Sequence, residues 1–371
     1  MFRVASRRPD RWRIAGLLGV IIFLWGWSAL PALASGIAAL CYHQIVPKAT
    51  GLFELSVEDF REQLALLKAQ GYESITTQQL LDILAGRFQP LKKPVLLTFD
   101  DGYRSVYDHA FPIMKEFGFV GVACIYPQFI DSQGGMSWAQ LRELAAAGWS
   151  IEPHSMTHAN LWKAPTVPGA RQAFFEREII RPKQIIEEKL GRPVRVFTWP
   201  YGIYTEETEA IARQAGYAGA LTVDGGASYP GLDPFRIKRQ VVYRTDTREK
   251  FLIRLGMGPL EVTDWDPRPG QVLAALATVT CRLPALADYA PGRYVLNAKI
   301  TGGGLAFGFD PATRRLTATV KGKLKEGQHF IDIYLRDQRT GVTAQHGWLF
   351  TIGTPGRAAL GSAPAGYPAA P

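Results

Sequence analysis

Short apolar runs alternate with amphipathic helical patterns along the chain from Gly36 to about Val262. Repeated strand–helix units of this kind lay their strands side by side in a parallel sheet that helices cover. We therefore expect an α/β domain over residues 35–264, a distorted (β/α) barrel that is closed or nearly closed. The runs that predict its strands lie at 37–42, 94–99, 120–126, 149–152, 194–198 and 218–222, and the helical patterns at 57–70, 77–84, 107–117, 138–147, 170–190 and 205–215.

The pattern changes after about residue 264, where short and often alternating runs are separated by Gly, Pro and Asp turns. This spacing predicts a small all-β sandwich of antiparallel strands over residues 265–353, and its last part resembles bacterial immunoglobulin-like modules. A second domain is also expected because a chain of 371 residues exceeds the comfortable size of one hydrophobic core. Residues 354–371 are rich in Pro, Ala and Gly, so we expect a disordered tail there.

The first 34 residues have the outline of a secretory signal peptide. Arginines near the start precede an apolar run over 14–30, and Ala32 and Ala34 supply the small residues that a signal peptidase needs. We expect cleavage after Ala34, with an uncleaved signal anchor over 1–34 as the alternative. In both cases the rest of the chain is expected outside the cytoplasm, in the periplasm or associated with the cell envelope.

Charge and cysteine content exclude some classes of function. The formal net charge of +9 comes partly from the arginines of the N-terminal segment, and the chain has no block of lysine and arginine, so we expect no nucleic-acid partner. The three cysteines are too few and too scattered for a disulfide framework or a thiolate metal site. Cys41 and Cys124 lie in apolar runs and are interpreted as small core residues, and Cys281 is the third.

Two adjacent carboxylates, Asp100 and Asp101, follow the predicted strand 94–99 in the segment Thr-Phe-Asp-Asp-Gly. Active sites of α/β barrels lie at the carboxyl ends of the strands. Adjacent acids repel each other when both are ionised, so the pair is easiest to keep if a cation lies beside one of them. A simple Asp-Gly turn with solvated acids is the alternative interpretation.

Two histidines four residues apart, His154 and His158, follow the predicted strand 149–152 in the segment His-Ser-Met-Thr-His. Imidazole suits a divalent transition metal, and two histidines with one carboxylate make a ligand set that leaves positions open for water and substrate. Together with Asp101, the pair therefore indicates a metal site, although isolated histidines are usually structural.

A third polar segment, Trp199-Pro200-Tyr201-Gly202, follows the predicted strand 194–198. Proline fixes φ and glycine frees it, so this loop can hold a backbone N–H in one orientation beside a pocket. A plain turn at the end of a strand is the alternative.

Taken in chain order, TFDDG, HSMTH and WPYG resemble the motifs of the polysaccharide deacetylase family, carbohydrate esterase family 4, with its NodB-type homology domain. The resemblance covers about residues 38–239. The opening segment Leu-Cys-Tyr-His-Gln-Ile over 40–45 is similar to the branch that deacetylates poly-β-1,6-N-acetylglucosamine in biofilm matrices.

The resemblance implies a role for each matched residue. Asp100 would be the general base that takes a proton from a metal-activated water, and Asp101, His154 and His158 would hold one divalent metal ion. Zinc is the expected metal, and cobalt, nickel or iron would also suit these ligands. The backbone N–H of Tyr201 would stabilise the oxyanion. The substrate pocket is expected to include Tyr103, Trp199, Pro200 and Gly202, and exposed aromatics such as Tyr126, Trp138 and Tyr204 are candidates for stacking on sugar rings.

Two roles are less directly matched. The commoner family pattern has a late Leu-x-His element that supplies the general acid, but no histidine occurs between His158 and His329. We assign the general acid to His43, which follows the strand 37–42 and can reach the same rim, with a packed structural histidine as the alternative. The family also uses an arginine to orient the base, and Arg236 or Arg239 is the candidate.

The resemblance implies a metal-dependent hydrolase that removes N-acetyl groups from an extracellular polysaccharide, with poly-N-acetylglucosamine as the expected substrate. Deacetylation of peptidoglycan, chitin-type or O-acetylated glycans is the nearest alternative. A non-catalytic carbohydrate-binding or adhesion protein is the alternative from another class. The sandwich is left open between covering the barrel, contacting glycan and docking an envelope or exopolysaccharide-export partner.

Overall fold

The computed structural model describes residues 36–286, 290 and 292–354, which all fall within one compact unit of the chain. The predicted signal segment 1–34 and all but the first residue of the predicted tail 354–371 lie outside the described residues. Within the described ranges, no helix combines the length and the apolar character that crossing a membrane requires.

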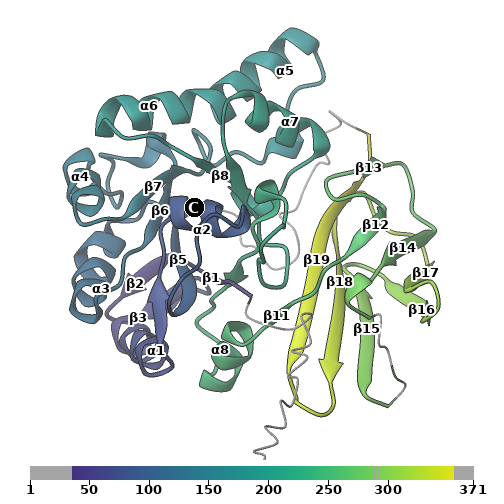
Figure 1. The fold of residues 1–371 in the computed structure, drawn as a ribbon. Helices are drawn as coiled ribbons and strands as arrows, with labels where there is room; N and C mark the ends of the chain where they lie inside the picture. The colour runs from purple at the N-terminus through teal and green to yellow at the C-terminus, as the bar shows by residue number, and fades with distance from the viewer. Residues whose placement is uncertain (1–35, 287–289, 291, 355–371) are drawn as a thin grey trace, which may run out of the picture. The chain divides into compact units, whose positions relative to one another are not determined.

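The amino-terminal part is built on parallel strands with helices around them (Figure 1). Six strands form one sheet in the order β10-β1-β5-β6-β7, with β4 also pairing with β5, and β8 and β9 form a separate parallel pair. Every pairing among these strands is parallel, which confirms the predicted α/β class. Their bounds are β1 Ala38–Tyr42, β4 Tyr72–Ser74, β5 Lys93–Asp101, β6 Val122–Ile125, β7 Ser150–Pro153, β8 Val196–Thr198, β9 Gly219–Leu221 and β10 Gln240–Val241.

The strands curl toward a barrel that is interrupted at one place. An isolated parallel bridge between Leu221 and Ile237 joins β9 to the segment just ahead of β10. Among the described strands, β7 and β8 do not pair, although a side chain bridges them: ring nitrogen Nδ1 of His154 lies 2.9 Å from the carbonyl oxygen of Thr198. The predicted barrel is therefore distorted, with its gap beside the HSMTH segment.

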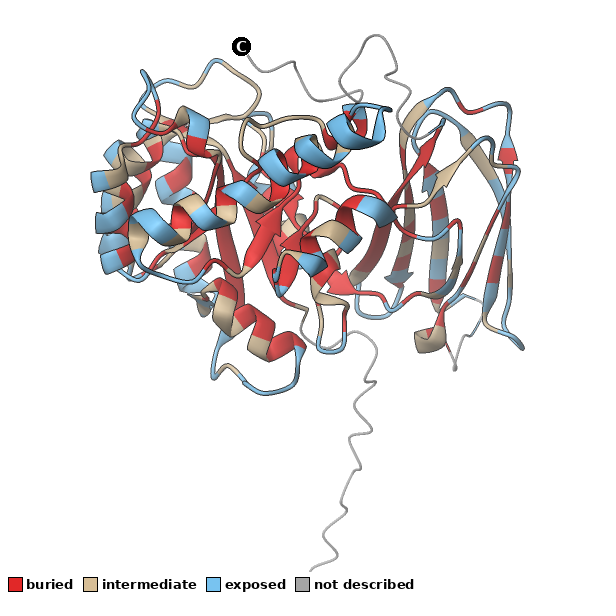
Figure 2. Ribbon diagram, turned by 90° about the horizontal axis from the view of Figure 1, so that it is seen from above, coloured by how far each residue is buried: buried red, intermediate tan, exposed pale blue. Residues whose placement is uncertain are grey.

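The helices pack around the strands, and Figure 2 shows buried residues on the strands and exposed residues on the outer sides of the helices. Ser56, Thr76, Ser137 and Thr205 cap four of them, each side chain accepting a hydrogen bond from the N–H three residues on. The predicted helices over 107–117 and 170–190 each contain a π-helical stretch, Val106–Ala110 and Glu176–Ile180. The bounds are α1 Val57–Ala69, α2 Thr77–Leu84, α3 Phe111–Phe117, α4 Trp138–Ala146, α5 Pro168–Phe175, α6 Arg181–Leu190, α7 Glu206–Gln214 and α8 Arg248–Leu255.

Strand β5 shows how the core positions the site. From Pro94 to Asp101 every residue is buried, because sheet neighbours and helices cover both faces. Apolar residues such as Leu97 and Phe99 lie in the main core, and the two aspartates end the strand beside Cys124 and Ile125 of β6. The apolar run thus holds two carboxylates at the carboxyl edge of the sheet.

The carboxyl-terminal part consists of two sheets around a separate core that includes Trp348, Phe350 and Ile333. Its long strands pair antiparallel, as predicted, whereas the short β11 and β13 pair parallel with β19. One sheet contains β11 Gly258–Pro259, β13 Val272–Leu273, β15 Tyr294–Ile300, β18 Gly327–Asp337 and β19 Thr343–Ile352; the other contains β12 Thr263–Asp266, β14 Thr278–Arg282, β16 Gly304–Asp310 and β17 Arg315–Lys321.

The predicted division between residues 264 and 265 falls inside β12, so the change of architecture begins earlier, at β11. β11 and β12 are too short to show an apolar pattern of their own, and only their pairing with β19 and β14 defines them.

Candidate active site

The carboxyl ends of the parallel strands meet at a cleft of about 270 Å³. Each sequence motif contributes to it: His43 follows β1, the two aspartates end β5, and the histidines follow β7. This is the edge at which α/β barrels place their active sites. The lining residues are Cys41, His43, Gln44, Gly51, Leu52, Phe53, Glu54, Asp100, Asp101, Tyr103, His154, His158, Trp199, Tyr201, Gly202, Val223, Arg239 and Val241.

Asp101, His154 and His158 converge on one point. Oδ1 of Asp101 lies 3.4 Å from Nε2 of His158 and 3.8 Å from Nε2 of His154, and one ligand atom from each residue lies within 4.8 Å of the others. Oδ1 of Asp101 is buried and has no hydrogen-bond partner among the described residues. Ligands around a tetrahedral zinc ion lie roughly 3.3 Å apart. The three residues therefore fit a divalent cation.

The orientation of His154 is set by its contact across the barrel gap. Its Nδ1 lies 2.9 Å from the carbonyl oxygen of Thr198, which can only accept a hydrogen bond. Nδ1 must therefore carry the proton, which leaves the lone pair of Nε2 facing the cleft as a ligand. Burial lowers the pKa of His154 and lowers that of His158 to about 3, so both imidazoles are neutral near pH 7.

The backbone is strained where these ligands stand. Asp101, Ser155 and His158 have φ values of 75°, 60° and 57°, in the left-handed region that residues with a Cβ seldom adopt. Such conformations cost about 1–3 kcal/mol each and persist where the surrounding structure enforces them, often at functional sites. Without a cation, burial and the neighbouring Asp100 raise the pKa of Asp101 to about 8.

Asp100 is held by a buried guanidinium. Nη1 and Nη2 of Arg239 lie 2.7 Å and 2.9 Å from its two carboxylate oxygens, and Arg239 also donates to Thr98 and to the carbonyl of Thr222. Burial alone would raise the pKa of Asp100, but Arg239 and the nearby His154 outweigh it and hold that pKa well below its usual range. Asp100 is therefore ionised, and it is the partner of Arg239 while Asp101 faces the histidines.

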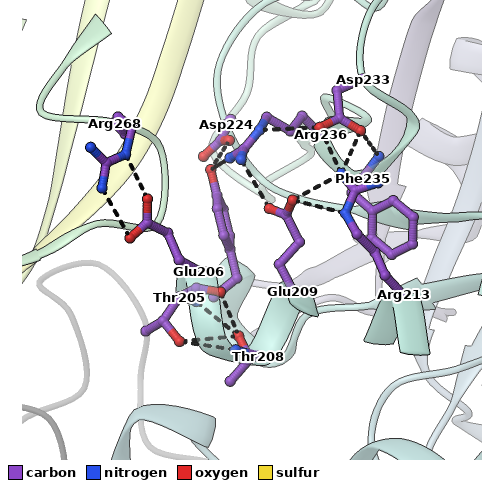
Figure 3. Close-up of polar contacts among 11 residues, drawn as sticks. Thr205, Glu206, Thr208, Glu209, Arg213, Asp224, Asp233, Phe235, Arg236 and Arg268 are labelled. Carbon is purple, nitrogen blue, oxygen red and sulfur yellow. Dashed lines mark hydrogen bonds and ion pairs between the residues drawn. The ribbon is translucent and has the colours of Figure 1, made fainter. Parts of the chain in front are cut away.

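Figure 3 shows that Arg236 belongs to a different cluster, on the side of α7. Its Nη2 lies 3.0 Å from Glu209, and Asp233 and the hydroxyl of Tyr204 are its other partners. The candidacy of Arg236 for orienting the base is therefore wrong. It stands in the short helix Pro234–Arg236, whereas Arg239 directly precedes β10 in the sheet.

Residues 89–220, which carry all three motifs, match the polysaccharide deacetylase family. The chain contains a polysaccharide deacetylase domain. It is 28% identical over 189 residues to the putative polysaccharide deacetylase YxkH of Bacillus subtilis, a match that covers 51% of this chain and 65% of that protein. It is 25% identical over 235 residues to the poly-beta-1,6-N-acetyl-D-glucosamine N-deacetylase of Escherichia coli, over 52% of this chain and 34% of that protein.

Neither match covers two thirds of the relative's own length. Among solved structures, IcaB from Ammonifex degensii aligns with a TM-score of 0.52 at 29% identity, over 59% of this chain and 95% of that one. The shared part is thus the deacetylase domain.

Two residues of the deacetylase domain flank Asp100 from β1. His43 lines the cleft, its buried Nδ1 has no hydrogen-bond partner within the described ranges, and burial lowers its pKa to about 4. Cys41, interpreted from sequence as a core residue, lies with its Sγ 3.3 Å from Oδ2 of Asp100. Burial raises the pKa of this thiol well above its ordinary value, so it donates to the carboxylate.

Cys41 was missed although a signal was present. Residues i and i+2 of a strand point to the same face, so a His43 that reaches the cleft brings Cys41 with it.

The WPYG loop enters the cleft through three of its four residues. Trp199, Tyr201 and Gly202 line the cleft, whereas Pro200 is buried and is not among the lining residues, which corrects its assignment to the pocket. Tyr201 and Gly202 have φ values of 60° and 68°, and a Cβ at Gly202 would lie 2.1 Å from Cγ2 of Val223. Only glycine fits there, because any side chain at this position would collide with Val223.

Of the other aromatic residues predicted to contact sugar, two lie at the cleft and two pack in the core. Tyr103 lines the cleft, and Tyr126 lies beside it with its ring centroid 5.6 Å from that of His158. Tyr204 is fully buried and donates its hydroxyl to Asp224, so it cannot stack on a sugar. Trp138 packs against the main core, which also argues against a role in stacking.

Proposed function

We propose that this protein is a metal-dependent hydrolase that removes N-acetyl groups from an extracellular polysaccharide, with poly-N-acetylglucosamine as the favoured substrate and zinc as the favoured ion. The observation that carries the proposal is that two adjacent aspartates in one cleft have different partners. Asp100 is held ionised by Arg239, and Asp101 faces two neutral histidines beside it. The name of the Escherichia coli relative favours the polymer.

A divalent cation held by Asp101, His154 and His158 would polarise the acetamide carbonyl and lower the pKa of a water molecule. The chain's own residues supply the rest of the reaction. Asp100 accepts the proton of the attacking water, because Arg239 keeps it charged and its oxygens are close to the ligand set. The backbone N–H of Tyr201 is proposed to stabilise the oxyanion, since Tyr201 lines the same cleft.

The leaving amine must gain a proton, and His43 is proposed to deliver it. Its imidazole is neutral near pH 7, since burial lowers its pKa to about 4. It therefore has to receive a proton before it can give one. Asp100 is the source that the geometry offers, because a ligand atom of each lies within 4.8 Å of the other. The proton taken from water can pass from Asp100 through His43 to the amine.

His43→Gln is expected to lower kcat by about 10²- to 10⁴-fold, the usual share of a general acid. Glutamine keeps a polar group at the rim but cannot carry a proton to the amine. Acetate release under saturating substrate is the measurement, with bound metal as the control. Unchanged kcat would assign His43 a packing role, next to Phe53, whose ring centroid is 4.6 Å away.

The proposal is tested by metal content and acetate release. The purified chain is expected to contain close to one divalent ion and to release acetate from β-1,6-linked N-acetylglucosamine oligomers faster than from β-1,4-linked ones. A chelator should stop the release and zinc restore it. His158→Ala should lose the ion and the activity, whereas His109→Ala should keep both, because His109 lies outside the cleft lining.

The outcomes separate the alternatives. Preference for β-1,4 oligomers or for O-acetylated glycans would change the proposed substrate but not the proposed hydrolase activity. A chain that binds glycan but releases no acetate with the ion bound would support the non-catalytic alternative.

Export and the role of the sandwich belong to the same proposal. We propose that the N-terminal segment directs the chain to the periplasm or cell envelope, and that the sandwich is immunoglobulin-like. Its strand β19 is almost wholly buried. The carbonyl of Gly347 accepts a hydrogen bond from Nζ of Lys238, and its N–H donates to the carbonyl of Gly225 in the deacetylase domain. These contacts favour a covering role for that strand. A partner for polysaccharide export would then have to use the other sheet.

A further inference from the structure

The loop between α2 and β5 exposes apolar side chains to solvent. Leu91 is 100% exposed and Phe88 is 40% exposed, and they are two of six large apolar side chains exposed among the described residues. Single exposed apolar residues need no explanation. Two exposed apolar side chains in one short loop, one of them fully exposed, are unusual.

The same loop is basic. Arg87 and Lys92 of the loop and Lys93, the first residue of β5, are all exposed. Arg87 is paired with Asp82 at 2.7 Å, and the Nζ of Lys93 lies 5.5 Å from the centroid of the Tyr72 ring. Within the described ranges neither Lys92 nor Lys93 has an acidic partner. The loop therefore combines protruding apolar side chains with two unneutralised positive charges.

The loop borders the place where the rest of the chain attaches. A hollow of about 1300 Å³ is lined by Phe88, Leu91, Lys92 and Lys93 together with Gly36, the first described residue. The 35 residues joined to Gly36 include the apolar run 14–30. Gly36, where the described residues begin, thus lies on the same surface as the exposed apolar loop. We call the surface formed by Gly36, Phe88, Leu91, Lys92 and Lys93 the basal face.

The basal face lies at the other end of the strands from the cleft. Gly36 precedes β1 and the loop precedes β5, and these strands are parallel. At about 3.3 Å per residue, the length of β5 separates Lys93 from Asp101 by roughly 26 Å. A surface that contacted the basal face would leave the cleft open on the opposite side.

We propose that the basal face rests on an anionic lipid bilayer, with Phe88 and Leu91 inserted among the headgroups and Lys92 and Lys93 beside the lipid phosphates. Apolar insertion and basic attraction together are the two signals that stable attachment requires. The cleft then points away from the membrane, toward a polymer outside it. This inference concerns where the protein sits and does not depend on the reaction it catalyses.

The test uses the full chain in vesicles, with a probe that distinguishes contact of the loop from anchoring by the N-terminal segment. Leu91→Cys is labelled with an environment-sensitive fluorophore, which is selective because Cys41, Cys124 and Cys281 are buried. The matched control is Val167→Cys, 64% exposed at the start of α5. The vesicles contain phosphatidylglycerol and a quencher placed at headgroup depth.

We expect the Leu91 probe to shift to the blue and to be quenched, and the Val167 probe to stay unquenched. Lys92→Glu with Lys93→Glu should reduce the quenched fraction severalfold, as should vesicles without anionic lipid. Lys321→Glu with Lys323→Glu, exposed lysines of the sandwich, should not.

Equal quenching at both probes, or none at either, would overturn the proposal. A blue shift at position 91 without quenching would also overturn it, because protein rather than lipid would then cover the loop.

Discussion

Replacing Asp100 with asparagine is expected to abolish measurable acetate release while bound metal stays at the level of the unmodified chain. Asparagine has nearly the same shape as aspartate but cannot take up the proton of the attacking water, and such a loss costs about 10²- to 10⁴-fold in rate. The metal should remain because its candidate ligands are Asp101, His154 and His158. Acetate release and metal analysis on the same preparation are the two measurements.

The control for this variant concerns the buried guanidinium. Asp100→Asn leaves Arg239 with a buried positive charge and a neutral partner, so thermal unfolding must be recorded to show that the chain is folded. Asp108→Asn is the matched substitution, because Asp108 is paired with Arg104 at 3.3 Å on the surface, where ion pairs contribute little. Full activity of Asp100→Asn would end the proposed mechanism, and parallel loss of the metal would make Asp100 a ligand rather than a base.

Arg239→Met is expected to lower both stability and activity by a large amount. Methionine fills a similar volume but leaves the buried carboxylate of Asp100 without its countercharge, which typically costs about 3–5 kcal/mol of unfolding free energy. Burial, the largest influence on the pKa of Asp100, would then act without the opposing charge, and the pKa would rise. The base would be partly protonated at neutral pH, so kcat should fall and its acid limb should move to higher pH.

The stability loss of Arg239→Met should depend on pH in a definite direction. In the unmodified chain the depressed pKa of Asp100 means that the ion pair stabilises the fold above the unfolded value, near 4, and that this contribution is lost as pH falls further. In the variant, folding favours the protonated acid. The stability deficit should therefore be largest near pH 7 and should shrink as the pH is lowered toward 4, which chemical denaturation at several pH values can measure.

Arg236→Met is the matched control. It removes an arginine only three positions away, whose partner Glu209 keeps a second ion pair with Arg213 at 2.9 Å. We expect kcat within about twofold of the unmodified chain. The side chains of Arg236 and Glu209 are only 15% and 10% exposed, so the stability loss should lie between the ~1 kcal/mol of surface pairs and the about 3–5 kcal/mol of buried ones. If the two arginine variants lowered kcat equally, the bidentate pair of Arg239 with Asp100 would have no special role in the reaction.

Much of the architecture was predictable because its causes are local. Apolar runs of strand length and helical periodicity each report burial of one segment, and parallel order follows from their alternation. The motifs were predictable for a related reason. Asp100, Asp101 and His154 all come at or just after the ends of buried strands, and the carboxyl ends of parallel strands meet at one edge.

The α/β class, the order of the strands and helices and the residues that gather at the rim therefore follow from the sequence alone. Three features are visible only in the folded chain. Arg239 is the arginine that reaches Asp100, Cys41 contacts the same carboxylate, and Tyr204 and Pro200 are buried. The Arg239–Asp100 bond joins residues 139 positions apart, and the two candidate arginines stand three positions apart. Local pattern cannot separate them, because a long-range contact depends on how the sheet curls and what packs behind it.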